Sequence, residues 1–199
     1  MTETWDEIWL RKGREQTNDF KRLNGYERTA FDVRAVAAAI VKELDMQPGG
    51  RLLDVGCGAG SLGEEVLKLL PGTTYVGTER SSTMVQTHIK LLGHSVLNFS
   101  AAEPVFSDKF FDYALCFSVF QYFESHNYAR ETIKQLLRQA RDVFVGDLPV
   151  ESHDNTHQLY TQETAAAWIS EMTAKSGATL KITNGLYNPH RFNVIIKQS

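Results

Sequence analysis

The 199-residue sequence predicts an α/β domain built on a doubly wound, mostly parallel sheet. Segments rich in β-branched and aromatic residues alternate with segments of helical apolar spacing, which is typical of βαβ crossovers. The first predicted strand opens directly onto a glycine-rich turn, where open α/β sheets have their ligand crevice. About eight residues separate the last two strands, too few for a helical crossover, so this pair is expected to be antiparallel.

Residues 1–50 are expected to form a helical N-terminal cap. Apolar side chains three and four residues apart predict a short first helix; they are Trp5, Ile8 and Trp9. After a polar stretch at 11–24, apolar residues recur at helical spacing from residue 26 to residue 44. Pro48 and the two glycines after it end this second helix.

From residue 51 onward, strands and helices alternate as one sheet core that extends to residue 199. The strands are expected at 51–55, 74–77, 95–99, 111–117, 142–146, 179–183 and 192–197. The helices are expected at 62–70, 82–92, 128–140 and 162–175. The sequence contains no internal repeat and no linker, so a single domain is expected over residues 1–199.

Composition narrows the range of partners. The formal net charge is −3 and no basic cluster is present, so no nucleic-acid partner is expected. No apolar run approaches the roughly 20 residues that span a bilayer, so no membrane partner is expected. The two cysteines, Cys57 and Cys116, form no disulfide framework, which favours the cytoplasm. The acidic N-terminus does not resemble a signal peptide.

The glycine-rich turn reads Asp54-Val55-Gly56-Cys57-Gly58-Ala59-Gly60-Ser61. Glycines allow a tight turn and close approach to a ligand, and the free N–H groups of the following helix favour an anionic group. Ser61 and Glu64 have the spacing of a capping box, which predicts that the helix starts here.

The sequence of this turn is compatible with two kinds of cofactor. Residues 58–63 match the dinucleotide pattern GxGxxG, and the acidic Glu79 follows about 20 residues later, which would indicate an NAD-dependent oxidoreductase. Asp54, however, stands directly before the glycines, where its carboxylate repels a pyrophosphate and attracts the cationic end of a cofactor. The chain also has no spare length for a separate substrate domain.

Residues 52–60 resemble the first motif of the class I S-adenosylmethionine-dependent methyltransferases, closest to the small type 11 group. Residues 75–79 resemble the second motif, whose acidic residue holds both ribose hydroxyls. Residues 110–119 resemble the fourth motif. The resemblance implies a Rossmann-like, seven-stranded sheet of order 3-2-1-4-5-7-6, with strand 7 antiparallel and helices on both faces. It also implies S-adenosylmethionine as the cofactor.

The resemblance assigns a cofactor role to particular residues. They are Asp54, Gly56, Cys57, Gly58 and Gly60 along the methionyl part, Glu79 at the ribose, Arg80, Ser81, Ala101 and Ala102 beside the adenine, and Phe117 and Ser118 facing the cofactor. Two positions depart from the family pattern. The acidic adenine ligand before the fourth strand is absent, with Glu103 as a candidate substitute. Gln139-Ala140-Arg141 replaces the usual Pro-Gly-Gly before the fifth strand.

The candidates for catalysis lie at or after strand ends: Asp147, His153, His157 and Tyr122. Asp147 could be a general base or a turn residue, and Tyr122 a substrate contact or a core residue. The two histidines are four residues apart, so they could bind a metal, include a base or be plain surface residues. Their turn-rich surroundings do not favour a metal, and no metal site is predicted. Trp5 and Trp9 could form a lid or simply pack on the domain.

We therefore expect methyl transfer from S-adenosylmethionine to a small-molecule acceptor, on oxygen or nitrogen, for example a sugar or another biosynthetic intermediate. The first alternative is a catalytically silent module that binds S-adenosylmethionine. The second is the NAD-dependent oxidoreductase. No oligomeric state is predicted.

Overall fold

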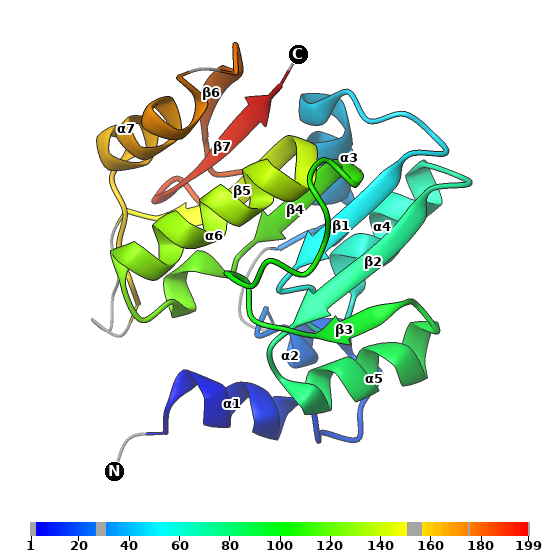
Figure 1. Cartoon of the computed structure of the whole chain (residues 1–199). Coiled ribbons are helices and arrows are strands. Elements are labelled where there is room, and N and C mark those ends of the chain that lie inside the picture. Colours follow the sequence, from blue (N-terminus) through cyan, green and yellow to red (C-terminus); the bar gives the residue numbers. More distant parts are fainter. Residues whose placement is uncertain (1–2, 27–30, 151–156, 175, 199) are drawn as a thin grey trace.

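The structure is a computed structural model that describes residues 3–26, 31–150, 157–174 and 176–198. Its sheet has seven strands in the order β3-β2-β1-β4-β5-β7-β6 (Figure 1). β7 is antiparallel to both β5 and β6, and the other pairs are parallel. The predicted strand order and the antiparallel last strand are therefore confirmed.

The strands are β1 Arg51–Val55, β2 Thr74–Glu79, β3 Val96–Asn98, β4 Phe111–Phe117, β5 Ala140–Pro149, β6 Thr179–Asn184 and β7 Arg191–Lys197. The helices are α1 Trp5–Lys12, α2 Phe20–Leu23, α3 Val33–Leu44, α4 Ser61–Leu69, α5 Ser82–Leu92, α6 His126–Gln139 and α7 Gln162–Thr173, with a short 3₁₀ helix, η1, at Phe120–Tyr122. α2 and η1 were not predicted, because such short segments show no helical period.

α3 begins later than residue 26, where the apolar spacing predicted its start. The carboxylate of Asp32 caps the helix by accepting from the backbone N–H groups of Arg34 and Ala35, at 3.0 and 3.3 Å. The capping residue, and not the first apolar side chain, therefore sets the start of this helix.

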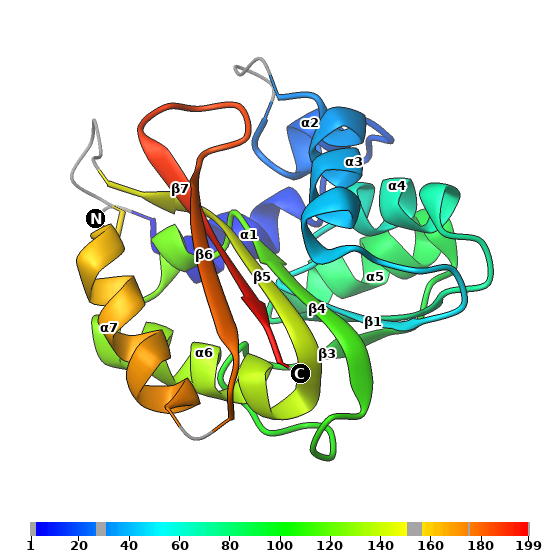
Figure 2. The ribbon, with the colours of Figure 1, turned by 90° about the horizontal axis from the view of Figure 1, so that it is seen from above.

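The core lies on both faces of the sheet, because successive strand residues point to opposite sides. Leu52 packs in a cluster with α3 and α4, whereas its neighbour Leu53 packs with α6 and α7. Figure 2 shows these two pairs of helices on opposite sides of the sheet. The doubly wound arrangement leaves the carboxyl ends of the parallel strands open for a ligand.

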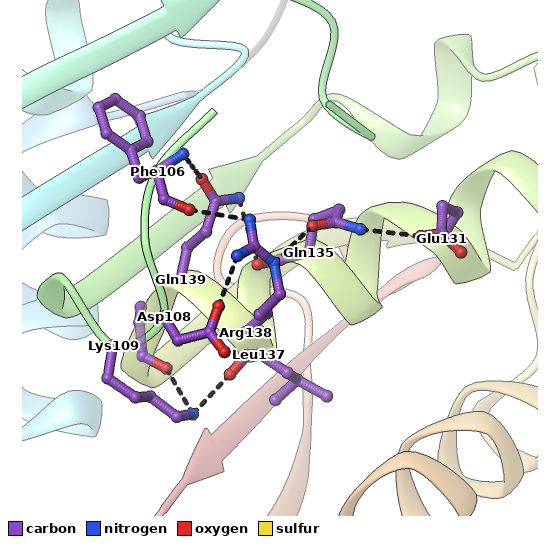
Figure 3. A network of polar contacts seen from close by, with 9 residues as sticks. Phe106, Asp108, Lys109, Glu131, Gln135, Leu137, Arg138 and Gln139 are labelled. Carbon is purple, nitrogen blue, oxygen red and sulfur yellow. Dashed lines mark hydrogen bonds and ion pairs between the residues drawn. The ribbon is translucent and has the colours of Figure 1, made fainter. Parts of the chain in front are cut away.

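α6 runs into β5 without an intervening loop, at the position where the family usually has Pro-Gly-Gly. The last carbonyls of a helix lack partners within the helix, and a cation there is favourable. The ammonium of Lys109 supplies this contact by donating to the carbonyl oxygens of Leu137 and Ala140 (Figure 3). Lys109 thus supplies a capping interaction in place of the turn.

The charged segment 103–109 is held against the end of α6 by side-chain contacts. The guanidinium of Arg138 donates to the carbonyl oxygen of Phe106 at 2.8 Å and forms an ion pair with Asp108 (Figure 3). The side-chain oxygen of Gln139 accepts from the backbone N–H of Phe106 at 3.0 Å. These bonds hold the far end of the connection between β3 and β4, which carries residues of the site described below.

β5 is longer than the predicted 142–146 and contains an irregularity. Its pairing with β7 shifts register between Val145 and Leu148, and Asp147 within this stretch has a φ of 64°. The backbone N–H of Asp147 donates to the side-chain oxygen of Asn193 at 3.1 Å. Irregularities of this kind are known to redirect side chains, and the side chain of Asp147 at this position is 2% exposed.

Candidate functional site

A cavity of about 400 Å³ opens at the carboxyl ends of β1, β2 and β4. This volume falls within the range of about 300–1,000 Å³ that is usual for small-molecule sites. The residues of the predicted cofactor set that line it are Asp54, Gly56, Cys57, Gly58, Glu79, Arg80, Ser81, Ala101, Phe117 and Ser118. Gly60 and Ala102 do not line it. The structure therefore brings most of the predicted set together around one cavity.

The glycine turn fits closely against its neighbours. Gly56 and Gly58 have φ angles of 72° and 53°, which favour glycine over any other residue. A Cβ added at Gly56 would collide with Val119, and one added at Gly58 would lie 2.5 Å from Oδ1 of Asn24. The backbone N–H groups of Gly56 and Cys57 both donate to the carbonyl of Thr78, which ties the turn to β2.

The predicted capping box of Ser61 and Glu64 is wrong. Gly60 is the capping residue of α4, with a φ of 93°, and it has no side chain that could cap the helix. The hydroxyl of Ser61 instead accepts from the side-chain amide of Asn24 at 2.9 Å. Gly60 thus shapes the end of the turn without facing the cavity.

Gly60→Ala is expected to destabilise the fold by about 3 kcal/mol. The positive φ costs about 1–2 kcal/mol for a residue with a Cβ, and the new methyl would also collide with the buried His88. Gly93→Ala is the matched control, because Gly93 has a φ of 70° but open space around it. Urea unfolding should show a clearly larger loss for Gly60→Ala, and equal losses would contradict the close packing of the turn.

Two carboxylates face the cavity from the ends of β1 and β2. Burial raises the pKa of Asp54 to about 7; a hydrogen bond from the hydroxyl of Tyr75, 3.0 Å away, opposes this rise and the charge of Glu79 adds to it. Burial also raises the pKa of Glu79, whereas the backbone N–H groups of Ser81 and Gly58, at 2.8 and 3.1 Å, lower it. An ionised carboxylate has about four acceptor positions, so Glu79 can also accept from two ligand hydroxyls.

α1 forms one wall of the cavity. The indoles of Trp5 and Trp9 line it and lie 4.6 and 5.1 Å from the ring of Tyr122. The hydroxyls of Thr83 and Thr87 in α5 donate to the carbonyls of Leu10 and Gly13, near the end of α1, at 2.8 and 2.6 Å. α1 therefore packs on the domain and forms part of the cavity wall, whereas its role as a lid stays a prediction.

Several lining residues were missed in the sequence: Asn24, Tyr26, Phe31, Asn98 and Phe99. Asn24 docks the N-terminal segment onto the glycine turn, because its Oδ1 accepts from the backbone N–H of Ala59 at 3.1 Å. Nothing in the local pattern separates such a residue from its polar neighbours. The one available signal for a lining residue was Tyr26, an aromatic residue just before a helical segment.

At the adenine end of the predicted site, Glu103 does not take the place of the missing acidic ligand. This side chain does not line the cavity, and its carboxylate accepts from the backbone N–H of Ser100 at 2.9 Å within its own loop. Asn98 and Phe99 stand in the cavity wall at this end instead.

The four catalytic candidates lie in different places. Tyr122 lines the cavity, whereas His157 stacks on Trp5 at 5.2 Å and borders a second, more open hollow. Asp147 does not line the cavity. His153 lies outside the described residues, so the pairing of the two histidines is not seen.

In the part of the chain that the structure covers, no group of three or more His, Cys, Asp or Glu side chains is arranged to hold a metal ion. None of the helices in the same ranges is long and apolar enough to cross a membrane.

The chain is similar to known methyltransferases. A family described as methyltransferase domain matches residues 53–144. The fold is similar to that in the complex between the Haloferax volcanii Trm112 methyltransferase activator and its methyltransferase, at 12% identity over 100% of this chain and 99% of that one, with a TM-score of 0.74. No protein of curated function matches the sequence.

Two further structures are similar. Magnesium protoporphyrin IX methyltransferase from Synechocystis PCC 6803, solved with bound S-adenosylmethionine, shares 19% identity over 96% of this chain and 89% of that one, with a TM-score of 0.63. The small RNA methyltransferase HEN1 shares 16% identity over 82% of this chain, with a TM-score of 0.67, and this chain spans 25% of it.

The chain has the fold of the class I S-adenosylmethionine-dependent methyltransferases. Its residues 53–144 match the family described as methyltransferase domain. The resemblance found in the sequence is thereby confirmed.

Proposed function

We propose that this chain is a single methyltransferase domain, with residues 1–50 as its cap, that binds S-adenosylmethionine and methylates a small molecule. The proposal rests on the cavity of about 400 Å³, which is lined by the glycine turn, Glu79 and the aromatic side chains of α1. When bound, S-adenosylmethionine supplies a methyl group on a positively charged sulfur. Such a cofactor needs a close backbone cradle, a ribose ligand and an environment that tolerates positive charge.

The residues around the cavity fit those needs. Gly56 and Gly58 line the cavity with positive φ angles, so the backbone itself can approach a ligand there. The carboxylate of Glu79 keeps acceptor positions for the two ribose hydroxyls. The carboxylate of Asp54 suits the ammonium of the methionyl part, and it argues against the pyrophosphate of a dinucleotide.

The charges of the cavity favour a small acceptor without phosphate. Among its described lining residues Arg80 is the one Lys or Arg side chain, and its guanidinium is 2.8 Å from the carboxylate of Asp6. The acids of the same lining are Asp6, Asp54, Glu79 and Glu124. A phosphate-rich acceptor such as RNA would be repelled, although one similar structure is a small RNA methyltransferase. The two cysteines are buried and free, which favours a reducing compartment such as the cytoplasm.

Thermal unfolding with added ligands tests the proposal. S-adenosylhomocysteine at 100 times its Kd is expected to stabilise the protein by about 2.7 kcal/mol, whereas NAD is expected to give no shift. A shift with NAD alone would favour the oxidoreductase. Binding of S-adenosylhomocysteine without methyl transfer to any small acceptor would favour the silent binding module.

A further inference from the structure

Two histidines that do not line the cavity lie next to the glycine turn. His88 belongs to α5 and is fully buried, and His94 follows the end of that helix. Nδ1 of His88 is 3.0 Å from the carbonyl oxygen of Gly58, and Nε2 of His88 is 3.1 Å from Nδ1 of His94. The two rings therefore form a chain of polar contacts that reaches a residue of the cavity wall.

The carbonyl oxygen of Gly58 sets the direction of this chain, because a carbonyl can only accept a hydrogen bond. Nδ1 of His88 therefore carries a proton and donates it. Burial lowers the pKa of His88 to about 4, so this ring is neutral at neutral pH and has a single ring proton. Its Nε2 is then an acceptor, and Nδ1 of His94 is the donor to it.

The groups at the two ends of the chain agree with this direction. The thiol of Cys57 is 3.5 Å from Nδ1 of His88, and burial raises the pKa of this thiol, so it stays a weak acceptor beside the carbonyl. At the other end, Nε2 of His94 is 3.3 Å from the carboxylate of Glu64 in α4, which Lys68 contacts at 3.2 Å. In its charged form His94 also donates to Glu64, so α4 supports the outer end of the chain.

The two rings are closely packed. The ring of Tyr75 lies 6.0 Å from that of His88 and 4.9 Å from that of His94, measured between centroids. A Cβ added at Gly60 would lie 2.4 Å from Nε2 of His88. The absence of a side chain at Gly60 therefore leaves the room that this imidazole occupies.

Gly58 links the histidines to the candidate ribose ligand. Its carbonyl accepts from His88, while its backbone N–H donates to Oε2 of Glu79 at 3.1 Å. Glycine restrains its own backbone less than any other residue, and Gly58 has a φ of 53°. A contact from outside the turn is therefore needed to keep the two peptide groups of Gly58 in one orientation, and His88 supplies it from α5.

We propose that His88 and His94 are positioning residues of the cofactor site: their chain of hydrogen bonds holds Gly58, and Gly58 holds Glu79 in the orientation that receives the ribose. This inference rests on the proposed function. Neither histidine touches the ligand. The affinity for the cofactor is then set by a hydrogen-bond donor at each of these two positions, and not by the bulk of the ring.

Two variants at position 88 test the inference by isothermal titration calorimetry with S-adenosylhomocysteine. His88→Asn keeps an N–H donor at the place of Nδ1, whereas His88→Leu is similar in size and has no donor. We expect His88→Leu to weaken binding about tenfold and His88→Asn to weaken it less than about threefold. Equal losses in both variants would show that only bulk matters and would overturn the inference, as would full affinity in His88→Leu.

A second pair of variants repeats the comparison at His94 and decides the question if His88→Leu does not fold. His94→Phe keeps a ring against Tyr75 but has no donor, whereas His94→Asn keeps a donor at the place of Nδ1. His94→Phe is expected to weaken binding at least about threefold, and His94→Asn is expected to stay within about twofold of the wild type. Equal affinities of these two variants would contradict the chain.

Two spectroscopic readouts do not depend on the ligand. In ¹⁵N NMR at pH 7, His88 is expected to be the neutral tautomer with its proton on Nδ1, and a proton on Nε2 would overturn the inference. Amide hydrogen exchange of Gly58 should be faster in His88→Leu than in His88→Asn. If S-adenosylhomocysteine fails to bind the wild type, the proposed function fails, whereas normal binding by the wild type and by all four variants overturns only this inference.

Discussion

Glu79→Ala is expected to weaken the binding of S-adenosylhomocysteine by about 100-fold, or 2.7 kcal/mol, while the protein stays folded. The carboxylate of Glu79 already accepts from the backbone N–H groups of Gly58 and Ser81, so it is held in one orientation toward the cavity. Two ribose hydroxyls would complete its acceptor positions, and each hydrogen bond to a charged group contributes about 1.5–3 kcal/mol. Isothermal titration calorimetry measures the change.

Glu103→Ala is the matched control for this variant. Its carboxylate bonds to Ser100 within its own loop and does not line the cavity, so the affinity should stay the same. A loss of affinity in Glu103→Ala equal to that in Glu79→Ala would restore Glu103 as a substitute for the missing adenine ligand. Unchanged affinity in Glu79→Ala would remove the ribose assignment.

The affinity for S-adenosylhomocysteine is expected to be about tenfold weaker at pH 6 than at pH 8 because of Asp54. Burial raises the pKa of this carboxyl to about 7, and the cationic ammonium of the ligand favours its ionised form. The effect on affinity is therefore fully present above pH 7 and is lost as the pH falls through 7. Asp54→Asn should abolish this pH dependence and weaken binding at pH 8 by about 2 kcal/mol.

In the protein without ligand, the free energy of unfolding is expected to change with pH in the opposite direction to the affinity. The folded carboxyl takes up a proton near pH 7, whereas an unfolded aspartate does so near 3.8, so the free energy of unfolding rises as the pH falls from 8 toward 4. The difference between wild type and Asp54→Asn isolates this contribution. Asp112→Asn, at the opposite end of the neighbouring strand, serves as the control. Equal affinity of the wild type at pH 6 and pH 8 would contradict the assignment of Asp54.

The features that could be predicted from the sequence are those fixed by local chemistry. The glycine turn follows a buried strand, and Glu79 ends the next strand, so both lie at the same edge of the parallel sheet. The short connection between β6 and β7 likewise requires an antiparallel pair. In each case a few neighbouring residues determine the outcome.

The missed features depend on contacts between distant segments. Asn24 acquires its role only when α2 reaches Ala59 in the glycine turn. Asp147 lies within a register shift that arises in the pairing of β5 with β7, which no local pattern reveals. The capping box failed for a related reason, because Gly60 with its positive φ became the capping residue and left Ser61 to bond with Asn24.

A crystal structure with S-adenosylhomocysteine tests the central claim most directly, namely that the cavity is a methyltransferase site. We expect the ribose hydroxyls within hydrogen-bond distance of Glu79, the methionyl part along Gly56 and Gly58, and the sulfur facing the side of the cavity that holds Tyr26 and Ser118. A ligand bound outside this cavity, or one whose ribose does not contact Glu79, would contradict the account.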